Sequence, residues 1–184
     1  MMTWLKRRLP HWDSILAVFA AIAFFTYGRT IYIFIFKVPA WLTFLRADEI
    51  GSALAYGLVF DLFESLAILG ALLGVCLLLP STWLKDHFVA RAAWFVIFVF
   101  CSILLFFHRY ATVGLDALAG IDRWTILTLL FAIPIAYAGG RVRLLNRFAV
   151  AAADRLIVLL LLFVPASLIS ILVVLGRNIF RGLS

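Results

Sequence analysis

The hydrophobic and polar positions of the chain form five long apolar runs, separated by shorter segments that hold most of the charges. A helix needs about 20 predominantly apolar residues to cross the hydrocarbon core of a bilayer. The pattern therefore predicts an all-α, polytopic membrane protein in which residues 1–184 form a single transmembrane domain. The five predicted spans are residues 14–36, 53–79, 92–107, 117–138 and 156–175.

The ends and interruptions of these runs refine the prediction. The first run continues to Phe36, well beyond the roughly 7 to 15 apolar residues of a signal-peptide core, so we expect a retained anchor. Asp122 and Arg123 interrupt the fourth run early, and Pro134 is expected to kink it. The segments between the spans, such as 37–52 and 139–155, are expected to be short loops that join antiparallel helices.

The composition excludes a water-soluble protein. Hydrophobic residues make up 66% of the chain and charged residues 14%, and the mean hydropathy is +1.15. A soluble domain of this size could not bury so much apolar surface, and few residues remain for an extramembrane domain. The net charge of +7 then suits membrane topology and anionic lipid better than nucleic acid, which we do not expect as a partner.

Lys and Arg are distributed unevenly between the two sides of the predicted membrane. Nine lie on the side of the N-terminus and six on the opposite side. Because cytoplasmic loops carry the excess of these residues, the N-terminus is expected inside and the C-terminus outside. Arg141, Arg143 and Arg147 belong to the inner group, and we interpret them as topology determinants attracted to anionic lipid.

Three charged residues fall inside the first two predicted spans. Arg29 lies seven residues before the end of the first span, Asp61 lies eight residues after the start of the second, and Glu64 follows one helical turn later. Charges in hydrocarbon require a partner or a water-filled cavity, so Arg29 is expected to pair with Asp61, Glu64 or both. Two interpretations remain open. The pair is a structural link between helices, or it forms a pocket at the outer leaflet in which Arg29 binds phosphate or the carboxylates attract a cationic headgroup.

His108 and Arg109 follow the third span and are a second candidate for contact with a phospholipid phosphate. Ordinary anchoring at the membrane interface explains the same residues. The sequence otherwise lacks the spacing of a metal site, a nucleophile with an activating base, a glycine-rich phosphate loop and a pair of haem ligands at one depth. We therefore predict no catalytic residue, no metal site and no cofactor.

The segment ALAYGLVFDLFESLAILGALLGVCLLLP, residues 53–80, resembles the second membrane helix of the lipoteichoic acid synthase-like family. These proteins are phosphoglycerol and phosphoethanolamine transferases with a sulfatase-type catalytic fold. Their Gly-Leu-Arg-Phe-Asp-Leu string reads here as residues 57–62, with Val59 in place of the Arg. Arg29 upstream and FFHRYATVGLD, residues 106–116, fit the same pattern.

The resemblance implies a bacterial cytoplasmic membrane, five helices, an inside N-terminus and an extracytoplasmic catalytic domain after the fifth helix. The family's nucleophilic threonine and divalent metal site have no counterpart in the sequence, which ends at Ser184. We therefore expect a non-catalytic membrane module, either independent or cut from a longer parent, that binds or presents phospholipid to a catalytic domain. The rival hypothesis is a structural accessory subunit of a large multisubunit membrane complex. A small transporter is less well supported, because no inverted repeat is visible.

Overall fold

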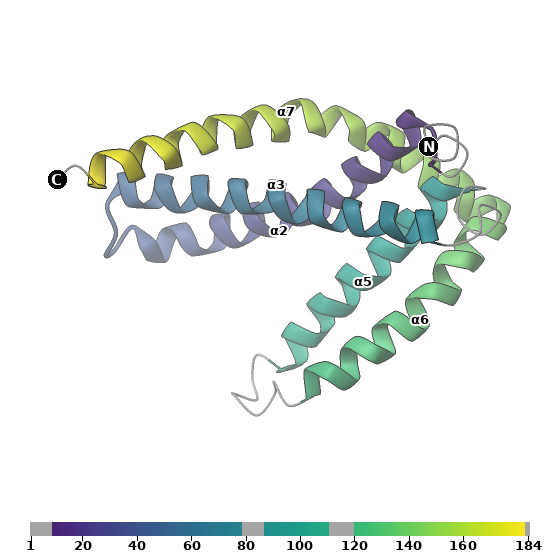
Figure 1. The fold of residues 1–184 in the computed structure, drawn as a ribbon. Coiled ribbons are helices and arrows are strands. Elements are labelled where there is room, and N and C mark those ends of the chain that lie inside the picture. Colours follow the sequence, from purple (N-terminus) through teal and green to yellow (C-terminus); the bar gives the residue numbers. More distant parts are fainter. Residues whose placement is uncertain (1–8, 79–86, 111–119, 183–184) are drawn as a thin grey trace. The chain divides into compact units, whose positions relative to one another are not determined.

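A computed structural model describes residues 9–78, 87–110 and 120–182 of the chain. The described residues form five long α-helices (Figure 1). Their bounds are Trp12–Trp41 for α2, Ala47–Leu78 for α3, Phe88–Tyr110 for α5, Ile121–Arg141 for α6 and Arg143–Gly182 for α7. Each helix is long and apolar enough to cross a membrane. The predicted all-α class and the five predicted helices are thus confirmed.

The helices extend beyond the apolar runs, so the expected loops 37–52 and 139–155 are wrong. Five residues, 42–46, join α2 to α3, and Val142 alone separates α6 from α7. At the start of α3, the Glu49 carboxylate accepts a hydrogen bond of 2.9 Å from the backbone N–H of Arg46, as the acidic residue of a capping box does. Hydropathy marks only the apolar middle of a helix and misses such polar ends.

The fourth helix also begins differently from the prediction. Asp122 lies in the first turn of α6 and Arg141 in its last turn, where each charge is favourable to the helix dipole. Asp122 and Arg123 therefore belong to a helix start rather than to an interruption, while the predicted start at Ala117 lies outside the described residues. The helix continues through Pro134, and α7 continues through Pro165.

The chain divides into two compact units. The first consists of residues 1–18 and 72–154, and the second of residues 19–71 and 155–184. Helices α5 and α6 belong to the first unit, whereas α2, α3 and α7 contribute residues to both.

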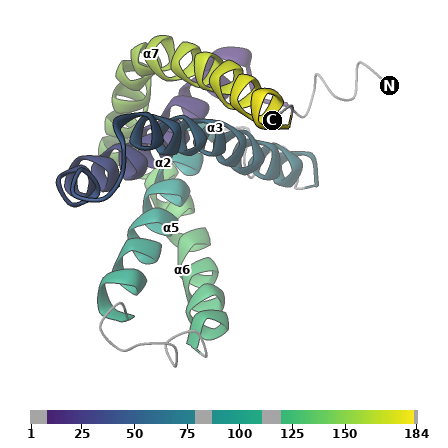
Figure 2. The ribbon, with the colours of Figure 1, turned by 90° about the vertical axis from the view of Figure 1, so that its left-hand side faces the viewer.

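In the first unit, α5 and α6 lie side by side (Figure 2). Two glycines of α6 allow bulky side chains of α5 to approach its backbone. A Cβ atom at Gly140 would lie 2.6 Å from Cγ of Arg91, and one at Gly139 would collide with the Trp94 ring. The Arg91 guanidinium lies 5.2 Å from the ring centroid of Tyr137. Glycine is thus required at these positions for close packing of the two helices.

In the second unit, the segments of α2, α3 and α7 lie alongside one another and share an apolar core (Figure 1). Tyr27 of α2 stacks on Phe163 of α7 with ring centroids 4.5 Å apart, and Leu62 of α3 packs beside them. At another point Tyr56 of α3 donates a hydrogen bond of 2.9 Å to Asn178 of α7. This three-helix unit contains Arg29, Asp61 and Glu64, the three charged residues that the sequence places inside the first two spans.

Candidate functional site

The candidate site lies where α2 meets α3 in the second unit. Arg29 and Thr30 belong to α2, and Asp61 and Glu64 belong to α3. Asp61 and Glu64 are three residues apart and so share one face of their helix. A Cβ atom at Gly57, one turn before Asp61, would lie 3.0 Å from the Thr30 methyl group, so the two helices approach closely here. We call these four residues, Arg29, Thr30, Asp61 and Glu64, the carboxylate cluster.

Arg29 and Glu64 form a two-pronged ion pair. The Nη2 atom of Arg29 donates to Oε2 of Glu64 at 2.6 Å, and Nη1 donates to Oε1 at 3.4 Å. The Arg29 side chain is 35% exposed and the Glu64 side chain 24% exposed, so the pair lies at the edge of the unit. The pairing predicted from matched depth is therefore present, and Glu64 is the nearer partner.

Asp61 is buried behind this pair, with 1% of its side chain exposed. Its Oδ1 atom accepts a hydrogen bond of 2.9 Å from the Thr30 hydroxyl and lies 3.6 Å from Nη2 of Arg29. Its Oδ2 atom is also buried and has no hydrogen-bond partner among the described residues. Asp61 is thus a carboxyl group whose second oxygen receives no hydrogen bond from the part of the chain that the structure describes.

Hydroxyl groups continue the polar contacts along α2. Thr26 bonds to Ser65 of α3 at 2.7 Å, and Tyr27 bonds to Ser167 of α7 at 2.6 Å. Ser167 in turn donates to the backbone oxygen of Leu58 at 3.1 Å. Because the Ser167 hydroxyl has one proton, this orientation makes Tyr27 the donor to Ser167. Three helices are therefore joined by a directed chain of hydrogen bonds.

Sequence reasoning missed these hydroxyl contacts. Thr, Ser and Tyr occur at many positions of the chain, and their spacing within one helix does not reveal which residue of another helix they face. The sequence contains only a weak sign of these contacts. Thr26, Tyr27, Arg29 and Thr30 lie within one and a half turns of a helix that is otherwise mainly apolar.

The other predicted site residues, His108 and Arg109, are near the end of α5, which belongs to the first unit. Their side chains are outside the described part of the structure. Further along the first unit, Arg91 and Arg141 place their guanidinium groups 5.2 and 5.4 Å from the centroid of the Tyr137 ring. Such cation–π contacts fix basic side chains against an aromatic ring at the end of α6.

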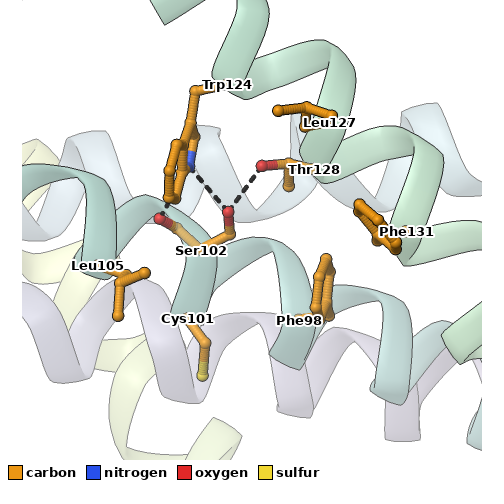
Figure 3. Close-up of a pocket in the computed structure, with 8 residues that line it drawn as sticks. All are labelled: Phe98, Cys101, Ser102, Leu105, Trp124, Leu127, Thr128 and Phe131. Carbon is orange, nitrogen blue, oxygen red and sulfur yellow. Dashed lines mark hydrogen bonds between the residues drawn. The ribbon is translucent and has the colours of Figure 1, made fainter.

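The first unit also contains an apolar pocket of about 400 Å³ between α5 and α6 (Figure 3). Three polar groups in its wall bond to one another. Nε1 of Trp124 donates to Oγ of Ser102 at 2.9 Å, and Ser102 bonds to Thr128 at 2.6 Å. Phenylalanine and leucine side chains and Cys101 complete the wall. The lining suits hydrocarbon, and its polar groups are already satisfied by one another.

The carboxylate cluster combines one guanidinium group, two carboxyl groups and one hydroxyl group. The N–H donors of Arg29 have a geometry that matches a phosphate group. Within the described residues, no three His, Cys, Asp or Glu side chains gather closely enough to hold a metal ion. Comparison with known proteins found no matching family model, no matching curated protein and no matching solved structure. The chemistry of the cluster is therefore the basis for a functional proposal.

Proposed function

We propose that this chain is a non-catalytic membrane module that binds phospholipid at the outer leaflet of a bacterial cytoplasmic membrane. In this proposal it presents the lipid to a catalytic domain, either of a partner or of a longer parent chain. The observation that carries the proposal is the partly exposed Arg29–Glu64 pair at the edge of a helical unit. An ionisable residue inside an apolar span is a candidate functional site, and an arginine that reaches the surface there offers hydrogen-bond donors to an anionic ligand.

The geometry favours the phosphate group as the part of the lipid that is recognised. A guanidinium group binds phosphate through two parallel hydrogen bonds, which is the arrangement that Arg29 makes with the Glu64 carboxylate. Glu64 therefore occupies Arg29 when no lipid is bound and competes with phosphate for it. The resemblance of residues 53–80 to a phospholipid-using transferase family agrees with this assignment.

Native mass spectrometry of the detergent-solubilised chain with added phosphatidylglycerol tests this proposal. Arg29→Gln should weaken binding by about tenfold or more, because a hydrogen bond to a charged group contributes about 1.5 to 3 kcal/mol. Glu64→Gln should strengthen binding, because it removes the carboxylate at 2.6 Å and leaves only Asp61, 3.6 Å from Arg29, to compete with phosphate for the guanidinium group. Arg155→Gln, an exposed arginine of the same unit, is the matched control and should bind normally.

Binding that is unchanged in both Arg29→Gln and Glu64→Gln would contradict the proposal. The purified chain should also show no phosphotransfer or lipid hydrolysis when a divalent metal is added. Turnover in that assay would indicate a catalytic site that the proposal does not contain.

The rival function, a structural subunit of a multisubunit membrane complex, is favoured by a different observation. The chain of hydrogen bonds from Tyr27 through Ser167 to Leu58 joins three helices and serves packing rather than binding. Purification from native membranes in a mild detergent separates the two functions. Bound phospholipid and a transferase partner support the lipid module, whereas a stoichiometric assembly of several subunits supports the accessory role.

A further inference from the structure

We propose that Asp61 is a reversible proton-binding site, which holds a proton while Arg29 is paired with Glu64. The inference concerns the charge state of the carboxylate cluster and does not depend on lipid binding. It follows from three features of the cluster: the burial of Asp61, the unequal distances from Arg29 to the two carboxyl groups, and the excess of carboxyl groups over guanidinium groups.

The carboxylate cluster has two carboxyl groups and one guanidinium group, so its charges do not balance when both carboxyl groups are ionised. Arg29 carries one positive charge, and both hydrogen bonds that its guanidinium group donates within the carboxylate cluster go to Glu64. Asp61 receives a hydrogen bond from Thr30, but Nη2 of Arg29 is 3.6 Å from its nearer oxygen and its Oδ2 has no partner among the described residues. An ionised Asp61 would be a second, incompletely compensated negative charge in an apolar segment.

A proton removes this excess charge better than another ion does. Coordination by oxygen typically requires six or more ligands around a cation such as Ca²⁺, and the described residues contain no group of three potential metal-binding side chains. The Arg29 guanidinium beside Oδ1 would also repel a second cation. A proton on Asp61 needs no such ligand shell and makes the cluster neutral, with Arg29 and Glu64 as a closed ion pair.

The surrounding groups define how the proton leaves. Among the described residues, the charged and titratable groups near Asp61 are Arg29 and the phenol of Tyr27 on α2 and Glu64 on α3. Helix α7 contributes the hydroxyl group of Ser167, which does not titrate. Nη2 of Arg29 lies 2.6 Å from Glu64 and 3.6 Å from Asp61, so a small shift exchanges its partner. When Arg29 turns to Asp61, Asp61 ionises and its proton passes to Glu64, which is partly exposed and can exchange it with the surroundings.

Infrared spectroscopy of the full chain in dodecyl maltoside micelles, which contain neither an ester carbonyl nor a phosphate group, tests this inference, because a protonated carboxyl group has its own carbonyl stretching band. We expect such a band at neutral pH. It should shift when aspartate carboxyl groups are labelled with ¹³C, stay in place when glutamate is labelled, and disappear in Asp61→Asn. The exposed Asp154→Asn is the matched control and should keep the band.

The Glu64→Gln variant tests the exchange of Arg29 between the two carboxyl groups. Without a charged Glu64, Arg29 should pair with Asp61, which then loses its proton, so the band should disappear. A band that survives in Glu64→Gln would overturn the exchange. A band that is missing from the wild-type chain, persists in Asp61→Asn or follows the glutamate label would overturn the proton site itself. Circular dichroism of each variant establishes that the helices remain folded.

Discussion

The phenol oxygen of Tyr27 lies 2.6 Å from the hydroxyl oxygen of Ser167, across 140 positions of sequence. Tyr27 is 1% exposed and also stacks on Phe163, so its ring and its hydroxyl group contact the same helix. The contact fixes the rotation of α2 against α7, because both the ring plane and the hydrogen bond must be satisfied together.

Tyr27→Phe keeps the stacked ring and removes the donor to Ser167. We expect a loss of about 1 kcal/mol in the free energy of unfolding, which is typical of one hydrogen bond between membrane helices. Denaturation by sodium dodecyl sulfate, followed by circular dichroism, measures this change. Tyr32→Phe is the control, because Tyr32 lies on the same helix and is 62% exposed. Equal losses in the two variants would contradict a specific role for the Tyr27 hydroxyl.

The Arg29–Glu64 pair should show non-additive effects. Removing one partner of a fully buried ion pair costs about 3 to 5 kcal/mol, because the other charge is left uncompensated. Since Arg29 and Glu64 are 35% and 24% exposed, we expect each of Arg29→Leu and Glu64→Leu to cost less than this. The double variant should be more stable than the sum of the single losses predicts. A double-mutant cycle with the same denaturation assay checks this, and strict additivity would refute the coupling.

Gly139 and Gly140 should be intolerant of even a small side chain. The Cβ atom of an alanine would meet the Trp94 ring in one case and the Arg91 side chain in the other. Forced repacking of this kind costs about 1 to 3 kcal/mol, so both Gly→Ala variants should lower the thermal stability of the purified chain. Gly74→Ala is the control, because no neighbouring atom lies within 4 Å of its added Cβ. Wild-type stability in Gly139→Ala and Gly140→Ala would show that α5 and α6 are packed differently.

The orientation of the chain in the membrane gives a further prediction. The nine-to-six distribution of Lys and Arg and the odd number of predicted spans predict that the C-terminus lies outside the cytoplasm. Alkaline phosphatase fused after Ser184 should therefore be active, since it folds only outside the cytoplasm, and green fluorescent protein at the same point should remain dark. The opposite pair of results would reverse the orientation.

The parts of the structure that the sequence predicted are those that depend on composition and depth. Five apolar runs sufficed for five helices, and the similar depth of Arg29 and the two carboxyl groups sufficed for an ion pair. The choice between Asp61 and Glu64 was not predictable, because it depends on how each helix is rotated about its axis. The Tyr27–Ser167 contact was missed for the same reason.

The helix ends were predicted least well, because their signals are polar and local. Arg46 is an unusual residue at the start of a helix, so the capping contact with Glu49 does not stand out in the sequence. The polar first turns of α7, from Arg143 onwards, have a helical conformation that hydropathy does not register. Loop lengths inferred from apolar runs are consequently too long.

Val142 is the single residue between α6 and α7, and both its backbone N–H and its backbone oxygen are hydrogen-bonded. Its N–H donates to the Ala138 oxygen at 2.9 Å, and its own oxygen accepts from the N–H of Asn146 at 2.9 Å. A peptide group that meets lipid without such partners loses several kcal/mol. The backbone of Val142 therefore needs no water to complete its hydrogen bonds, so one helix can give way to the next within a single residue even where water is scarce.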